Sequence, residues 1–164
     1  MATYLNGTYY NSLSSDAKSK VVKGTFNVST PGDTSDTETL ETDAKQEKQY
    51  QWKGYVALYT VTELLRASTT SGCSSLSAGY NSDSTGYCNS NNWLWPTFNS
   101  SSYQWTLSPS VISYCDIVWG VRSSGCVDNS TANNYRGACP VLHLSSDITL
   151  KGTGISSDPY TIAS

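Results

Sequence analysis

Apolar side chains recur about every four residues near the start of the chain, a spacing that places them on one face of a helix. The positions are Leu5, Tyr9, Leu13, Ala17 and Val21. The pattern predicts helical structure over residues 4–23. Gly7 and the polar residues 14–16 predict a break near its middle, where Ser14 or Ser15 can cap the second piece and Gly24 can end it.

Shorter apolar runs predict strands and one further helix. Residues 25–30 favour a short strand, and residues 51–60 a buried one. Residues 61–67 favour a helix, with Thr60 or Thr62 as its cap and Glu63 in its first turn. Later strands are predicted at residues 117–121, 126–128, 140–144, 148–150 and 160–162. The order of these elements indicates an α+β domain.

Two segments are defined by their side-chain types. Residues 31–48 carry six carboxylates and two lysines with almost nothing to bury, which predicts a long exposed segment. These carboxylates lack the spacing and the turn glycine of an EF-hand. The aromatic runs at residues 93–96 and 103–107 are expected to lie in the core, with Pro96 and Pro109 near their ends.

Composition narrows the partners that the chain can bind. Ser, Thr, Asn and Tyr number 28, 19, 11 and 12, whereas charged residues make up only 14%. Tyrosine among small polar residues is typical of recognition surfaces, and equally of a Ser/Thr-rich extracellular β-protein. The net charge of −3 with no basic stripe makes nucleic acid an unexpected partner. No apolar run is long enough to insert into a membrane.

The five cysteines indicate the compartment. Cys73 and Cys88 bracket a Ser-, Gly- and Asn-rich stretch, which predicts a loop closed by a disulfide and hence an oxidising environment. Cys115, Cys126 and Cys139 form an odd set, in which all three thiols or a single one remain reduced. No spacing of cysteine and histidine fits a metal site.

Catalytic chemistry has few candidate residues. His143 is the only histidine and lies in the alternating run Val141-Leu142-His143-Leu144, which favours a strand position over a catalytic one. Neither a Ser-His-Asp nor a Cys-His arrangement can be built without it. We therefore expect a protein that is not an enzyme and that uses no cofactor or metal.

Five strings taken together are similar to one family. They are residues 4–18, residues 56–67 (VALYTVTELLRA), residues 103–109 (YQWTLSP), residues 137–144 (GACPVLHL), and Gly152-Thr153-Gly154 with Asp158-Pro159-Tyr160. Their order resembles the C-terminal ectodomains of secreted, prepilin-like proteins of Gram-positive gut bacteria. Those ectodomains resemble the C-type-lectin and formylglycine-generating-enzyme fold, which is shared with the variable proteins of diversity-generating retroelements.

The resemblance implies a C-type-lectin-like α+β fold over residues 1–164 as one domain, with two short helices, small mostly antiparallel sheets and long loops. An anchor or prepilin segment removed before residue 1 would be consistent with it. The Glu-Pro-Asn and Trp-Asn-Asp strings of lectin calcium sites do not occur. Where the family has Gly-x-Arg-Pro, this chain has Cys139 at the arginine position, a change that suggests pairing of Cys139 with Cys115 or Cys126.

In the family, the ligand face comes from the C-terminal third, which places a binding face in residues 110–139. Tyr, Trp and Arg anchor interfaces, and Asn supplies hydrogen bonds around them. The expected ligand-binding residues are Tyr114, Asp116, Trp119, Arg122, Asp128, Asn133, Asn134, Tyr135 and Arg136.

These residues suggest three functions. The first is an extracellular or cell-surface display domain that binds a protein or glycan, in the manner of a retroelement variable protein. The second is the structural head of a pilus or filament subunit, which packs against neighbouring subunits. The third is a phage-tail adhesin on a virion. A polar loop with two edge strands and no partner would give the same residue types.

Overall fold

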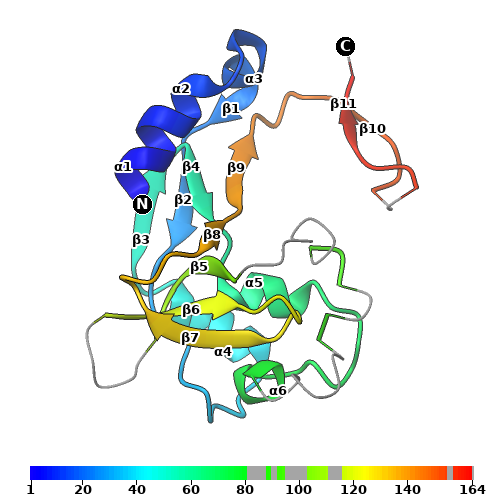
Figure 1. Cartoon of the computed structure of the whole chain (residues 1–164). Helices are drawn as coiled ribbons and strands as arrows, with labels where there is room; N and C mark the ends of the chain where they lie inside the picture. Colours follow the sequence, from blue (N-terminus) through cyan, green and yellow to red (C-terminus); the bar gives the residue numbers. More distant parts are fainter. Residues whose placement is uncertain (81–87, 90–91, 95–102, 111–115, 155–156, 164) are drawn as a thin grey trace. The chain divides into compact units, whose positions relative to one another are not determined.

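The computed structural model describes residues 1–80, 88–89, 92–94, 103–110, 116–154 and 157–163. These residues form a mixed α+β structure with short helices and several small sheets (Figure 1), which confirms the predicted α+β class, although the helices number more than the two expected. They group into two compact units, each assembled from separate stretches of the chain. One unit comprises residues 1–24, 53–57 and 141–164, and the other comprises residues 25–52 and 58–140.

The N-terminal helical stretch breaks where the sequence predicts. Its first part runs through α1 (Ala2–Tyr4), the π-helical turn η1 (Leu5–Tyr9) and α2 (Tyr10–Ser12), and it ends at Leu13, whose backbone is extended. The second part, α3 (Ser15–Lys20), begins at Ser14, whose hydroxyl accepts a hydrogen bond of 3.1 Å from the amide of Ala17. The helix stops at Lys20, earlier than expected, because Val21–Val22 form strand β1.

The other helices that the structure describes lie in the second unit. Helix α5 (Val61–Arg66) has a capping box, in which Thr60 accepts from the amide of Glu63 and the Glu63 carboxylate accepts from the amide of Thr60. This confirms the predicted helix and its cap. The remaining two are α4 (Leu40–Glu47) and α6 (Leu76–Tyr80).

The strands form four small sheets among the described residues. The three smaller sheets are β1-β9-β4, with β9 at Pro140–Leu144 and β4 at Val56–Leu58, β2-β3 (Gly24–Asn27 and Gln51–Gly54), and β10-β11 (Leu150–Lys151 and Thr161–Ile162). The largest, in the order β7-β6-β5-β8, comprises Val127–Thr131, Ile117–Val121, Gln104–Pro109 and Gly137–Ala138. Its pairs are antiparallel except for β5-β8, which is parallel. The predicted strands at residues 117–121 and 140–144 are confirmed to the residue.

In the first unit, Asn6 ties the N-terminal helix to strand β4. Its side-chain amide donates to the carbonyl of Val56 at 2.8 Å, and its oxygen accepts from the amides of Tyr55 and Val56. Tyr10 stacks on Tyr55 with ring centroids 4.5 Å apart. These contacts hold the helix against β4, and Leu5 of the same helix is buried.

The C-terminal hairpin of the same unit is a two-stranded ribbon. Strands β10 and β11 pair with each other and with no other strand in the described part of the chain. The ribbon leaves Leu150, Tyr160 and Ile162 exposed. Such ribbons are marginally stable alone.

In the second unit, helices α4, α5 and α6 cover one face of the four-stranded sheet (Figure 1). The apolar side chains that fill most of this layer come from both the sheet and the helices. They include Leu64, Leu65, Leu76, Trp119, Val121 and Val127. Because side chains alternate between the two faces of a strand, the neighbouring positions of β5, β6 and β7 point to the opposite face.

The prediction that residues 31–48 form an exposed polar segment is wrong. Helix α4 occupies residues 40–47, with Thr39 as its cap, and it buries Leu40, Asp43, Ala44 and Glu47 along one face. The carboxylate of Glu47 is buried because hydroxyl groups replace water around it: Ser108 donates to it at 2.6 Å, and Thr62 also donates. Three of the six carboxylates, Glu41, Asp43 and Glu47, therefore belong to a helix with one buried face.

The structure confirms some of the cysteine and tryptophan predictions and contradicts one. Cys73 and Cys88 form the predicted disulfide, which is compatible with an oxidising compartment. Cys126 is buried, and Cys139 is half-buried, a position that raises the pKa of its thiol; Cys115 lies outside the described residues. Trp105 is buried as expected, whereas Trp93 is largely exposed, contrary to the prediction; Trp95 lies outside the described residues. No helix in the described ranges is long and apolar enough to span a membrane.

Candidate ligand-binding surface

The predicted binding residues lie on strands β6 and β7 and on the turn that follows β7. Tyr114 lies outside the described residues. Asp116, just before β6, is exposed, and its carbonyl accepts a hydrogen bond of 2.7 Å from the amide of Ala132 at the start of the turn. This hydrogen bond joins the two ends of the β6-β7 hairpin, Asp116 before β6 and Ala132 after β7.

Trp119 is a correction to the predicted surface. Its side chain is 0% exposed and lies in the layer between the sheet and the helices, where its indole NH donates to the carbonyl of Gly32 at 3.3 Å. Strand β6 reads Ile117-Val118-Trp119-Gly120-Val121, and alternation places Trp119 on the same face as Val121, which is also buried. Trp119 is a core residue and cannot contact a ligand on the surface.

Arg122 and Asp128 pair with each other within the protein. They lie at the turn end of the β6-β7 hairpin and form an ion pair of 3.2 Å between Nε and Oδ2, with both side chains mostly buried. The turn between them is tight: the amide of Gly125, at φ +89°, donates to the carbonyl of Arg122. This pair holds the hairpin closed, and its opposite charges compensate each other.

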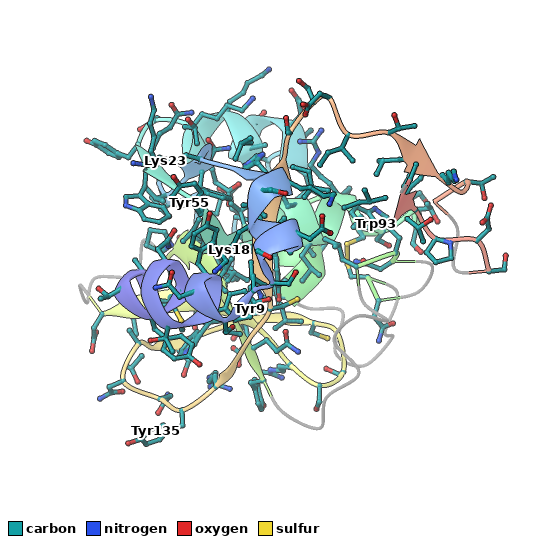
Figure 2. All side chains as sticks on the ribbon, turned by 90° about the horizontal axis from the view of Figure 1, so that it is seen from above. Tyr9, Lys18, Lys23, Tyr55, Trp93 and Tyr135 are labelled. Carbon is teal, nitrogen blue, oxygen red and sulfur yellow. A yellow bond between two sulfur atoms is a disulfide. The ribbon has the colours of Figure 1, made fainter. Side chains whose placement is uncertain are left out.

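The turn after β7 presents the most exposed of the predicted residues. Asn133, Asn134 and Tyr135 are all exposed, and Tyr135 is completely so. The turn is ordered by the backbone amide of Asn134, which donates to the Thr131 carbonyl at 3.1 Å. Figure 2 shows Tyr135 projecting outward, with no other labelled side chain beside it.

Arg136 is held in place beneath this turn. Its guanidinium carbon lies 4.0 Å from the ring centroid of Tyr103 and 5.3 Å from that of Trp105, distances at which a cation is attracted to an aromatic face. One of its terminal nitrogens donates to the Ser130 hydroxyl at 2.8 Å. Asn134 donates to the same hydroxyl at 2.6 Å. Arg136 is thus fixed before any ligand arrives.

The aromatic platform under Arg136 depends on Gly120. Trp105 pairs with Gly120 across the β5-β6 ladder, and a side chain at Gly120 would meet the Gln104 carbonyl at 2.8 Å and the Trp105 ring at 3.6 Å. Gly120 also pairs with Asp128 on β7, and Val118 pairs with Ser130. Trp105, Gly120 and Ser130 therefore share the face opposite to the helices.

We call Tyr103, Ser130, Asn134, Tyr135 and Arg136 the turn surface. The sequence indicated the last three but missed Tyr103 and Ser130. Tyr103 was assigned to the core with its neighbour Trp105, yet it is 37% exposed. A signal was present, because Tyr103 and Trp105 have the same parity on an alternating strand and would present adjacent rings.

Comparison with known proteins adds no relative: no family model, curated protein or solved structure matches this chain. Its function must therefore be argued from its own residues.

The surroundings of the other reactive groups that the structure describes do not suggest a second centre. His143 lies on β9 as predicted, paired with Val22, and its ring packs over Gly24. In the part of the chain that the structure describes, no group of three or more His, Cys, Asp or Glu side chains is placed to hold a metal ion. The turn surface is the arrangement best suited to contact another molecule.

Proposed function

We propose that this chain is an extracellular ligand-binding domain with a C-type-lectin-like fold, and that it binds its partner through the turn surface. The partner is a protein or a glycan on another cell or surface. The proposal assigns no catalysis to the chain and no cofactor to the binding.

The observation that supports it best is a fully exposed tyrosine next to an arginine that is already fixed. Tyrosine and arginine are the residue types most often found at the energetic centre of interfaces. Holding Arg136 on Tyr103 and Ser130 removes much of the side-chain entropy that binding would otherwise lose. Full exposure of Tyr135 means that the fold does not need its ring.

Two further features agree with the proposal. The Cys73–Cys88 disulfide suits a protein that works outside the cell. Asn133, Asn134 and Tyr135 lie on a turn whose supporting core consists of other residues, such as Trp119 and Val127. In the diversified form of the proposal, as in a retroelement variable protein, exposed positions between residues 110 and 139 could change while this core remains.

A second candidate function is the head of a pilus or filament subunit. One observation favours it: the β10-β11 ribbon exposes apolar side chains, and its edges pair with no other strand that the structure describes. Such features mark contact surfaces between chains. This candidate makes the ribbon, and not the turn surface, the principal contact. The phage-tail adhesin is a variant of the first candidate, with the same binding surface on a virion.

The first test is a selection of random displayed peptides against the immobilised protein. We expect enriched peptides whose affinity falls about 10- to 100-fold for Tyr135→Ala, because the exposed ring is the largest contact that the turn offers. The readout is the dissociation constant of each enriched peptide measured by surface plasmon resonance.

Tyr50→Ala is the matched control, since Tyr50 is 71% exposed and lies between α4 and β3. It should leave the affinities unchanged. Enriched peptides that bind Tyr135→Ala as tightly as the wild type, or a selection that enriches nothing, would argue against the turn surface as the binding site.

A further inference from the structure

The hydrogen bonds around Ser130 leave its hydroxyl hydrogen available to a ligand. The Ser130 oxygen accepts from Asn134 at 2.6 Å and from Arg136 at 2.8 Å. A hydroxyl oxygen has two lone pairs and one hydrogen, so both lone pairs are used and the hydrogen can point to a ligand. Asn134 also donates to the Thr131 hydroxyl at 3.2 Å.

The charge of Arg136 is not compensated within the described part of the chain. The other arginines have carboxylate partners there: Arg66 lies 3.5 Å from Glu41, and Arg122 lies 3.2 Å from Asp128. None of the ion pairs among the described residues includes Arg136. Its neighbours are two aromatic rings and a hydroxyl, which hold a cation in place without neutralising it.

A partly buried guanidinium beside a hydroxyl donor selects for an acceptor that carries negative charge. Carboxylates fit best, because a guanidinium and a neighbouring O–H can each bind one carboxylate oxygen. We propose that the turn surface recognises an acidic side chain, Asp or Glu, on a protein ligand, with Arg136 and Ser130 as the contacts and Tyr135 packing alongside. This inference rests on the proposed function and specifies its partner.

The aromatic rings decide between an acidic peptide and an acidic sugar. Sugar rings are usually held by stacking on an exposed aromatic face that the fold keeps fixed. Arg136 covers one face of Tyr103, and Trp105 is only 6% exposed, so Tyr135 is the one fully open ring of the turn surface. Tyr135 is exposed on all sides and suits packing against a peptide chain. The geometry therefore favours a protein ligand.

The test uses two displayed peptide libraries that are identical except that one contains Asp and Glu where the other contains Asn and Gln. We expect strong enrichment from the acidic library only. Arg136→Gln should weaken the enriched peptides about 10- to 100-fold, since it removes a charge-assisted hydrogen bond. Arg136→Lys keeps the charge but loses the planar stacking, and should fall between the two.

Arg66→Gln is the control, because it removes the same charge from an exposed position on α5. It should leave the affinities within about twofold of the wild type, as expected for a distant surface charge. Circular dichroism melting of each variant checks that it is folded. If Arg136→Gln does not fold, Arg136→Lys still tests the role of the guanidinium.

The outcomes separate the two proposals. Equal enrichment from both libraries, with affinities that depend on Tyr135 but not on Arg136, would overturn the acidic ligand and leave the binding surface standing. Binding to immobilised glycans rich in uronic or sialic acid that depends on Arg136, without enrichment of acidic peptides, would also overturn the protein ligand. Enrichment that depends on neither Tyr135 nor Arg136 would overturn both.

Discussion

Replacing Trp119 with Ala should lower the free energy of unfolding by about 3–5 kcal/mol, the usual loss for a large aromatic side chain removed from a core. Trp119 is completely buried, and its indole NH donates to the Gly32 carbonyl, which connects β6 to the segment before α4. The substitution would leave a cavity between the sheet and the helices and an unsatisfied carbonyl at Gly32.

Urea denaturation followed by circular dichroism measures this loss. Tyr135→Ala is the control and should stay within about 0.5 kcal/mol of the wild type, because Tyr135 makes no core contact. If Trp119→Ala unfolded at the same urea concentration as the wild type, the ring would not be part of the core, and the earlier expectation of a surface tryptophan would be restored.

The stability of the protein should fall as the pH rises from about 4 to about 7, and Asp43→Asn should remove most of this fall. Asp43 is completely buried on α4, and neither of its carboxylate oxygens has a hydrogen-bond partner in the described part of the chain. Burial, and then the charges of Asp36, Glu47 and Glu38, raise the pKa of Asp43 from 3.8 to about 7.

The direction of this pH dependence follows from the protons that the folded and unfolded chains bind. Between pH 3.8 and about 7 the folded protein holds a proton on Asp43 that the unfolded chain has lost, so folding becomes less favourable with each unit of pH. Burial also raises the pKa of Glu47, although hydroxyl donors oppose the shift, and this adds in the same direction. Above pH 7, Asp43→Asn should gain about 1–3 kcal/mol, less than the full shift would give, since solvent relaxation screens part of the charge.

Urea denaturation at pH 4, 6 and 8 checks this prediction. At pH 4 the variant should be no more stable than the wild type, because the wild-type carboxyl is then protonated. Glu41→Gln, which changes an exposed carboxylate on the same helix, should leave the pH dependence unchanged. A wild type whose stability rises between pH 4 and 8, in parallel with that of Asp43→Asn, would contradict the buried, uncompensated carboxylate.

Periodic segments with clear caps could be predicted from the sequence. Helix α5 was found from its apolar face and from Thr60 and Glu63 at its start, which form the capping box. Helix α4 was missed because its buried face includes the carboxylates of Asp43 and Glu47. The hydroxyls that accommodate Glu47 come from Thr62 and Ser108, far along the chain, and no sequence pattern near Glu47 indicates them.

The binding surface was predictable in part, for a similar reason. Exposed Asn134 and Tyr135 follow from their place in a polar turn. Trp119 was misassigned because β6 is apolar on both faces, so residue type alone could not show which face is buried. The position of Arg136 on Tyr103 and Trp105 depends on the parallel pairing of β5 with β8, a long-range contact that the sequence does not reveal.

The central claim is that this protein binds its partner through the turn surface. The most direct test is a nuclear magnetic resonance titration of the isotope-labelled protein with the tightest acidic peptide from the selection. The account predicts that the largest chemical-shift changes fall on Ser130, Asn134, Tyr135 and Arg136, with little change in β10 and β11. Changes concentrated in the β10-β11 ribbon, with the turn unaffected, would contradict it and favour the filament subunit.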